Sequence, residues 1–471
     1  MAIEYVGKTG TKYYVSDNPI ASGGEGVVSK IDNYPSYVAK VFKDDRRTFD
    51  REKKLNAMIQ HKLNEEQCKQ LTWPVDVLYD QKGFAGYVML LLKNGNNLNE
   101  LMAKSFNEIN YKHRVLVAYN ICAVVDTIHE MDQVCGDLNP QNICVNMDMT
   151  SKEALNVTFV DTDSYHINAT SMIYRCEVGL ANYIAPEIQK KMAQGYNLKT
   201  APLPTYTKET DLFALAVHIF TLLMNGTHPF ACAKDNGNGY EDTIGQMNGA
   251  SHESVVMPQP VDNIKNGFFP FVEKIDGITI PVYSLKFNAL PQKIRELFIK
   301  TFSDGYKEPS KRSTAKEWMD VIREYLINSE FAGCMNRHIY FSESSSCPFC
   351  EMAERQKILF AQINKRNVSV QLTEQSNKNV NVVNAGIQVQ QVNTTSSNNQ
   401  QYNYSGLSNI AGQYTNENEK SKPSIWFMVL IIVVVCIIAG LMFSEIIPKE
   451  TKRSYGQSYE TSESGYDTGL E

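Results

Sequence analysis

Three polar side chains in the middle of the chain could carry out chemistry on a phosphate. Asp137 and Asn142 lie five residues apart ahead of the apolar stretch Ile143-Cys144-Val145, and Asp161 follows a second apolar pair, Phe159-Val160. A carboxylate can accept a proton from a hydroxyl group. Carboxylate and amide oxygens are also ligands that Mg²⁺ accepts. These residue types at this spacing make nucleotide chemistry the leading hypothesis.

A second group of chemically active residues follows about 170 residues later. Cys334, His338, Cys347 and Cys350 supply three thiolates and one imidazole, and the Cys-Pro-Phe-Cys pair is typical of a zinc knuckle. Four protein ligands leave no open coordination position, so the predicted Zn²⁺ is structural. The alternative is that these are four unrelated buried residues.

The elements that must position the first group change in character along the chain. Residues 1 to about 100 alternate apolar and polar residues in short runs, which predicts strands with one helix around Arg46–Leu63. From about 100 to 330 the pattern is helical. Tyr111–Met131 has a broad apolar face, and Asp211–Met224 is apolar nearly all round, which indicates a buried central helix. The predicted fold class is therefore α+β, with a small strand-rich lobe followed by a larger helical lobe.

Several segments in this order resemble the protein kinase family. Residues 20–28, Ile-Ala-Ser-Gly-Gly-Glu-Gly-Val-Val, resemble its glycine-rich loop, with Ala21 in place of the first glycine. Residues 37–42, Tyr-Val-Ala-Lys-Val-Phe, look like the strand that carries its ATP-binding lysine. Residues 185–187, Ala-Pro-Glu, resemble the end of its activation segment. The resemblance covers about residues 10–328 and implies a bilobal kinase fold that uses ATP and Mg²⁺.

The resemblance also implies a role for each matching residue. Asp137 would accept the proton of the substrate hydroxyl, and Asn142 and Asp161 would hold Mg²⁺. Lys40 would reach the α- and β-phosphates, because strand alternation places it on the face of Val38 and not on that of Lys43. The implied catalytic residues are Lys40, Asp137, Asn142 and Asp161. The implied nucleotide-binding residues are Gly23, Gly24, Gly26, Val28, Val38, Lys40, Glu52, Leu90 and Leu91.

The resemblance also implies three contacts between side chains or with the catalytic loop. Glu52 is the best match to the helix glutamate that pairs with the lysine in this family, and the alternative is an exposed surface glutamate. Asp211 resembles the residue that braces the catalytic loop. Arg312 should pair with Glu187 across the large lobe.

The chain also departs from the family pattern near the phosphates. Gly136 replaces the arginine before the catalytic aspartate, Asn139 replaces a lysine and Leu180 replaces an activation-segment threonine. Thr162-Asp163 stands where most kinases have Phe-Gly. Losing the arginine argues against activation-loop phosphorylation as a switch. The set resembles the divergent, bacterial-type branch of eukaryotic-like kinases.

The last hundred residues are predicted to be a tether and an anchor. Residues 366–424 are rich in Asn, Gln, Ser and Thr and carry too little apolar surface to fold. Ile425–Phe443 is uncharged and, as a helix, would span about 28 Å, close to the bilayer hydrocarbon thickness. A transmembrane helix is predicted, with a buried core helix as the alternative. The basic residues Lys449, Lys452 and Arg453 follow the span and do not favour a cytosolic kinase domain, whereas the start of the chain, which lacks a signal peptide, does.

Composition limits the possible partners. The net charge is -6 and Lys and Arg are scattered, which argues against nucleic acid. We therefore expect a single-pass membrane protein whose cytosolic Ser/Thr kinase domain uses ATP and Mg²⁺ on protein substrates. A nucleotide-binding pseudokinase scaffold and a small-molecule kinase remain alternatives. The expected segments are 1–93 (small lobe), 94–330 (large lobe), 331–365 (zinc module), 366–424 (linker), 425–443 (membrane helix) and 444–471 (polar tail).

Overall fold

The small lobe is built around six strands that close into a barrel in the order β1-β2-β3-β4-β6-β5, with every neighbouring pair antiparallel. A computed structural model describes residues 2–104, 108–170, 172–235 and 257–361, and all structural statements concern these ranges. The strands are β1 (Ala2–Gly7), β2 (Lys12–Ser22), β3 (Gly26–Ile31), β4 (Tyr37–Phe42), β5 (Asp76–Asp80) and β6 (Gly83–Leu90). Their alternating apolar side chains fill the barrel; the core includes Tyr5, Tyr13, Val15, Ile31, Leu78 and Val88.

The strand register sets up one face of the nucleotide site. Lys40 on β4 lies directly opposite Val28 on β3 and Tyr87 on β6. Directly opposite residues point to the same face of a sheet, so these three side chains share a face. A side chain at Gly26, where β3 begins, would clash with the carbonyl of Val41. The close approach of β3 and β4 therefore requires glycine at this position.

Two helices belong to this lobe. Helix α1 (Phe49–Gln60) begins at Thr48, whose hydroxyl accepts a hydrogen bond from the Arg51 amide, and it buries Leu55 and Met58. Helix α2 (Glu65–Gln70) begins with a reciprocal capping box. The sequence pattern predicted the first of these helices, with boundaries about three residues too wide at each end.

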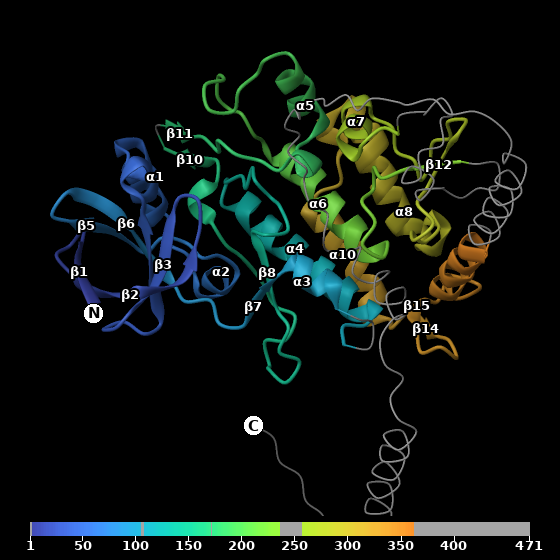
Figure 1. Cartoon of the computed structure of the whole chain (residues 1–471), viewed down its shortest axis with the longest axis horizontal. Coiled ribbons are helices and arrows are strands. Elements are labelled where there is room, and N and C mark those ends of the chain that lie inside the picture. The colour runs from blue at the N-terminus through green and yellow to red at the C-terminus, as the bar shows by residue number, and fades with distance from the viewer. Residues whose placement is uncertain (1, 105–107, 171, 236–256, 362–471) are drawn as a thin grey trace, which may run out of the picture. The chain divides into compact units, whose positions relative to one another are not determined.

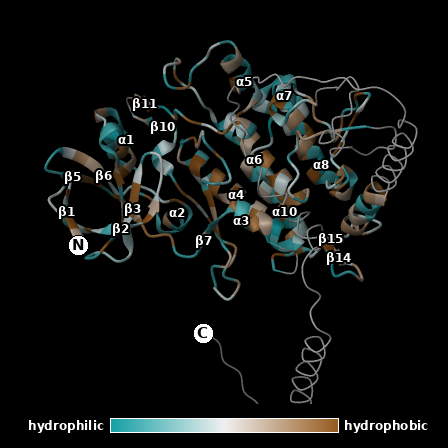
Figure 2. Cartoon of the chain, viewed as in Figure 1, coloured by the Kyte–Doolittle hydropathy of each residue, from teal (hydrophilic) through white to brown (hydrophobic). Residues whose placement is uncertain are grey.

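The large lobe is organised around helix α4 (Tyr111–Glu130), which packs against both α6 (Lys208–Leu223) and α10 (Ala315–Ile327). Helix α6 is buried along almost its whole length, as its sequence predicted. Figure 1 shows these helices on the opposite side of the small sheet β7-β8-β9 from the barrel, and Figure 2 shows hydrophobic residues along α4 and α6. The remaining helices are α3 (Leu98–Ala103), α5 (Pro186–Ala193), α7 (Pro260–Asn266), α8 (Gln292–Ile299) and α9 (Gly305–Lys307).

The remaining strands are short and support the loops that follow the small lobe. The sheet β7 (Gly95–Asn97), β8 (Ile143–Asn146) and β9 (Val157–Phe159) supports the loop that carries Asp137 and the one that carries Asp161. The other short strands form three two-stranded antiparallel sheets: β10 (Ile167–Ala169) with β11 (Met172–Tyr174), β12 (Ala233–Lys234) with β13 (Ile278–Thr279), and β14 (Phe331–Gly333) with β15 (Ile339–Phe341). The predicted bilobal architecture is confirmed.

The segment after the large lobe packs against it. Residues 348–361 are helical. The ring of Tyr111 on α4 lies 5.4 Å from the rings of both Phe341 and Phe349, and Arg355 donates a hydrogen bond to the Ser284 carbonyl at 2.5 Å. Among the helices that the structure describes, none has the length and apolarity needed to cross a bilayer. The predicted linker, membrane helix and polar tail at 366–471 lie outside the described residues.

Candidate active site

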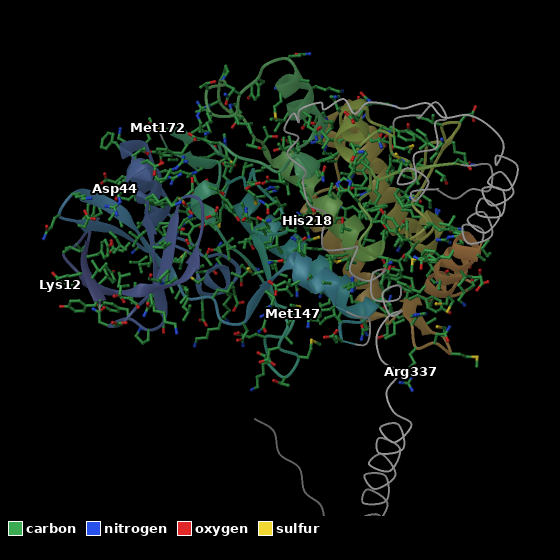
Figure 3. The ribbon with its side chains drawn as sticks, viewed as in Figure 1. Lys12, Asp44, Met147, Met172, His218 and Arg337 are labelled. Atoms are coloured by element: carbon green, nitrogen blue, oxygen red, sulfur yellow. The ribbon has the colours of Figure 1, made fainter. Side chains whose placement is uncertain are left out.

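The loop that carries Asp137 is fixed from below by the central helices. The carboxylate of Asp211 on α6 accepts hydrogen bonds from the amides of Cys135 at 2.7 Å and Gly136 at 2.9 Å. His218, two turns further along α6, lies within the large lobe (Figure 3), and its Nε2 is 3.0 Å from the Leu138 carbonyl. The predicted bracing role of Asp211 is confirmed. Burial lowers the pKa of His218 to about 4, so the imidazole is neutral and its Nε2–H donates to the carbonyl.

Asp137 and Asn142 lie side by side in this loop. The Asn142 Nδ2 donates to the Asp137 carbonyl at 3.0 Å and approaches the Asp137 Oδ2 at 3.3 Å. These contacts orient the carboxylate that would receive a proton. They also use the amide nitrogen of Asn142 and leave its Oδ1 as the atom suited to a metal.

The structure explains why residue 136 is glycine. Gly136 has a φ of +74°, and an added Cβ would come within 2.9 Å of the Cys176 sulfur and 3.2 Å of the Tyr206 ring. Both the backbone conformation and the surrounding space therefore exclude an arginine there. Tyr206 also donates to the Val178 carbonyl at 2.8 Å, so neutral contacts brace the activation segment at this point.

Lys40 meets two carboxylates. Its Nζ lies 2.5 Å from the Asp161 Oδ1 and 2.7 Å from the Asp163 Oδ1, and the Tyr87 hydroxyl donates to the same Asp163 oxygen at 2.7 Å. Burial opposes the charge of Lys40, but Asp163 and Asp161 outweigh it and raise the lysine pKa above its ordinary value. Lys40 is therefore a permanently charged group placed where it could meet phosphate oxygens.

The predicted pairing of Lys40 with Glu52 is wrong. The Glu52 Oε1 accepts a hydrogen bond from the Tyr79 hydroxyl on β5 at 2.6 Å. Glu52 does share a helical stripe with Leu55 and Met58, but the first turn of that stripe lies against β5. The positions that face the site instead carry cations: the Arg51 guanidinium lies 4.6 Å from the Phe42 ring centre, and the buried Lys54 donates to the Arg175 carbonyl at 3.3 Å.

The two carboxylates around Lys40 differ in access to solvent. The Asp161 side chain is 40% exposed, whereas that of Asp163 is 1% exposed. Burial and the neighbouring Asp163 raise the pKa of Asp161 despite the opposing effect of Lys40. Burial would also raise the pKa of Asp163, but Lys40, the Tyr87 hydrogen bond and Arg51 outweigh it and lower that pKa. Asp161 is thus the carboxylate that a metal ion could reach, and with Asn142 it makes an all-oxygen set that fits Mg²⁺.

The glycine-rich loop and the hinge complete the candidate site. Gly23 and Gly24 have open space around their α-carbons, so the backbone there could approach phosphates closely. Glu25 of this loop forms an ion pair with Arg51 of α1 at 2.7 Å. In the segment that joins the two lobes after β6, called the hinge, the Leu91 amide donates to the Ser36 carbonyl at 2.9 Å. The predicted nucleotide contacts of Leu90 and Leu91 would therefore fall to their carbonyls and to neighbouring amides.

The predicted pair between Arg312 and Glu187 is confirmed. Arg312 donates to the two carboxylate oxygens of Glu187 at 2.8 and 2.6 Å, and the arginine side chain is fully buried. Arg312 also donates to the Glu209 carbonyl at the start of α6 at 2.8 Å. The pair therefore joins the activation segment, α6 and the last helix of the lobe.

The four predicted zinc ligands lie together. The His338 Nδ1 is 3.5 Å from the Cys334 and Cys347 sulfurs and 3.4 Å from that of Cys350, and the Cys334 and Cys350 sulfurs are 3.8 Å apart. All four ligand atoms lie within 4.8 Å of one another. A tetrahedral Zn²⁺ with bonds of about 2.1 Å to nitrogen and 2.3 Å to sulfur would need separations of about 3.5–3.8 Å. The four separations of 3.4–3.8 Å fit that geometry.

Sequence reasoning missed two members of the lysine cluster. Asp163 was noted only as a departure from the family pattern, and Tyr87 was not singled out. The available signal was the second acid in Asp161-Thr162-Asp163, together with two basic residues, Arg51 and Lys54, on the inner side of the predicted helix.

Comparisons with known proteins agree with this geometry. The protein kinase domain family matches residues 14–325. The protein kinase YegI of Escherichia coli O157:H7 is 24% identical over 368 residues, which cover 74% of this chain and 50% of that protein. YegI of Escherichia coli strain K12 is 24% identical over 387 residues, covering 77% and 53%. The chain thus spans about half the length of these curated relatives.

Among solved structures, a crystal structure of Rad53 1–466 in complex with AMP-PNP is similar with a TM-score of 0.41 and 17% identity. It covers 65% of this chain and 64% of that one. Because the kinase domain match takes in the catalytic loop, the lysine strand and the Glu187–Arg312 pair, and extends over well more than half of the sequence, the chain belongs to the protein kinase domain family, whose members use ATP and Mg²⁺.

Proposed function

We propose that this protein transfers the γ-phosphoryl group of ATP to serine or threonine hydroxyls of protein substrates. The observation that carries the proposal is the loop in which Asp211 fixes the backbone and Asn142 orients the Asp137 carboxylate. In that position Asp137 accepts the hydroxyl proton as the acceptor oxygen attacks phosphorus. When bound, Mg²⁺ supplies neutralisation of the phosphate charge, and Asn142 and Asp161 are the residues that would hold it.

The activation segment supports a protein as the phosphate acceptor. Ala185-Pro186-Glu187 is tied to Arg312, which supports an ordered platform for a polypeptide. The pseudokinase alternative is favoured by Asn139, whose side chain accepts a hydrogen bond from the Gln141 amide at 2.9 Å and brings no positive charge toward the phosphates. The two readings differ in transfer and agree in nucleotide binding.

The test is incubation of the purified full chain with labelled ATP and Mg²⁺, followed by phosphoamino-acid analysis of the chain and of a generic protein substrate. Labelled phosphoserine or phosphothreonine that disappears in Asp137→Asn supports the proposal. Asp148→Asn, an exposed acid on the turn after β8, is the matched control and should retain labelling. ATP binding without any labelling would establish the pseudokinase, and label found only on small molecules would establish the third alternative.

We also propose that Cys334, His338, Cys347 and Cys350 bind one structural Zn²⁺. The mutual distances of their ligand atoms support it, as does the packing of this module on Tyr111. Elemental analysis of protein purified without chelator should find one zinc per chain. Cys347→Ser should release it, whereas Cys68→Ser on α2 should not. Zinc-free wild-type protein would contradict the assignment.

We further propose that Ile425–Phe443 anchors the chain in a membrane with the kinase domain in the cytosol, where ATP is available. The uncharged run supports the anchor. Protease added to intact cells should remove only the short tail beyond Phe443. Digestion of the kinase domain under these conditions would place it on the other side, as the charges at Lys449, Lys452 and Arg453 suggest.

A further inference from the structure

The lysine cluster contains one more carboxylate than a phosphate-binding lysine and a metal site require. Lys40 contacts both Asp161 and Asp163, and each carboxylate approaches within 2.7 Å of the ammonium nitrogen. If both contacts were lost when nucleotide and metal bind, the buried ammonium would have to be held by phosphates alone. The geometry therefore raises the question of which carboxylate stays.

Solvent access separates the two. Asp161 is 40% exposed on its side chain and belongs to the set that fits Mg²⁺ with Asn142. Asp163 is 1% exposed, and its Oδ1 accepts from both Lys40 and Tyr87. This Oδ1 cannot turn toward a metal without leaving both donors unsatisfied, which is costly in a buried site. The Oδ2 has no hydrogen-bond partner among the described residues, but it is buried from solvent as well. Asp163 is thus committed to Lys40.

Helix α1 offers no carboxylate that could replace it. Glu52 is bound to Tyr79, and the residues on the inner side are Arg51 and Lys54. Arg51 is itself occupied by Glu25 of the glycine-rich loop at 2.7 Å. Helix α1 therefore brings cations toward the site and supplies no carboxylate to the lysine.

Resting on the proposed nucleotide site, we propose that Asp163 is the positioning residue that holds Lys40 at all times, so that Asp161 can leave the lysine and bind the metal. In the absence of nucleotide Lys40 is shared between the two carboxylates. When Asp161 turns to the metal, Lys40 keeps its charge partner and its direction. The lysine is thereby anchored from the segment that follows the metal-binding aspartate and not from α1.

This division of roles predicts a specific effect on metal dependence. In Asp163→Asn, Asp161 is the one carboxylate left to Lys40 in the described site, so the metal must compete with the ammonium for it. The Mg²⁺ concentration that gives half-maximal ATP binding should rise about tenfold, the equivalent of one charge-assisted hydrogen bond. A merely structural role for Asp163 would weaken ATP binding at every Mg²⁺ concentration without moving this midpoint.

The experiment measures ATP binding to the purified full chain by isothermal calorimetry across a Mg²⁺ series. Wild type, Asp163→Asn, Asp163→Glu and Glu52→Gln are compared. Asp163→Glu keeps the carboxylate and should restore most of the wild-type midpoint, and Glu52→Gln, the matched acid on α1, should not move it.

Tyr87→Phe keeps the test available if Asp163→Asn does not fold. This variant removes one donor from Asp163 and leaves the carboxylate to Lys40, so the Mg²⁺ midpoint should shift by twofold or less. A tenfold shift in Tyr87→Phe would contradict the proposal.

The outcomes are distinct from those of the proposed function. An unchanged midpoint in Asp163→Asn, or a large shift in Glu52→Gln, overturns the role of Asp163 even if the protein phosphorylates substrates. A wild type that binds Mg-ATP without transferring phosphate removes the proposed activity and leaves this inference to be decided by the midpoints. A wild type that does not bind ATP overturns both.

Discussion

The Lys40 cluster and the Arg312–Glu187 pair each join a buried cation to carboxylate oxygens, yet they obey different constraints. Arg312 and Glu187 meet through two parallel hydrogen bonds of 2.8 and 2.6 Å, a geometry that fits guanidinium and carboxylate alone. Lys40 is a compact charge on a flexible stem, and any nearby carboxylate can satisfy it. The Arg312–Glu187 pair therefore follows the family pattern, whereas Lys40 is paired with Asp163 and Asp161 and not with the helix residue Glu52.

The second difference concerns what each contact connects. Arg312 links three segments of the large lobe, and loss of Glu187 would leave its guanidinium buried without a charge partner. Lys40 instead joins strand β4 of the small lobe to the segment that follows β9. A partner from the neighbouring loop, Asp163, does the same electrostatic work as one from a helix. The comparison teaches that a contact that depends on geometry needs particular residue types. A contact that depends only on charge can be made by any nearby group of the right charge.

The largest effect should come from the catalytic loop, which Asp211 braces. Asp137→Asn should lower the rate of phosphoryl transfer by about 10²–10⁴ because the proton acceptor is lost, while ATP affinity stays close to that of wild type. Asp161→Asn should weaken Mg-ATP binding as well. Single-turnover transfer and calorimetric affinity distinguish the two. Equal loss of affinity in both variants would show that their roles are not separate.

Breaking the Arg312–Glu187 pair should destabilise the fold. Arg312→Leu should reduce the free energy of unfolding by about 1–3 kcal/mol, because two charge-assisted hydrogen bonds are lost while the Glu187 carboxylate left behind is 29% exposed and can be solvated. Urea denaturation followed by fluorescence measures this. Lys311→Leu, which removes the adjacent exposed cation, should leave the unfolding midpoint nearly unchanged. A small effect of Arg312→Leu would mean that this pair is as replaceable as the partner of the lysine.

The large lobe should also be sensitive to acid. Burial lowers the pKa of His166, His218 and His228 to about 4, whereas an unfolded histidine titrates near 6.5. Between these values the unfolded chain binds more protons, so the free energy of unfolding must fall as the pH is lowered from 6.5 to 4. The slope should approach about 1.4 kcal/mol per pH unit for each histidine. Denaturation across this range tests it, and a flat profile would show that the imidazoles are accessible to protons in the folded state.

The smallest effect should come from Glu52, which the sequence predicted to pair with Lys40. Glu52→Gln disturbs one hydrogen bond to Tyr79 and should change the free energy of unfolding by about 0.5–1.5 kcal/mol. Transfer rates should stay near those of wild type. Loss of activity comparable to that of Asp137→Asn would restore Glu52 as the partner of Lys40.

The order of the motifs was enough to predict the bilobal fold, the bracing by Asp211 and the pairing of Glu187 with Arg312. These depend on sequence spacing and on residue types with few substitutes. The periodicity of Phe49–Gln60 also predicted a helix. It could not say which of the neighbouring residues Arg51, Glu52 and Lys54 faces the lysine, because a helix of 3.6 residues per turn offers each a plausible side.

The sequence by itself determined which chemistry-bearing residues exist and in what order: a lysine strand, a catalytic loop, a metal-binding aspartate and a Cys/His cluster. Only the tertiary structure decided which charges meet, since it closed the barrel through β1 and β5, turned Glu52 toward Tyr79 and buried Asp163 beside Tyr87 and Lys40. The physical reason is the distance along the chain over which each kind of contact is chosen. Secondary structure follows from neighbours a few residues apart, whereas the partner of a charge is chosen among all groups that folding brings within about 4 Å, here across more than a hundred residues of chain.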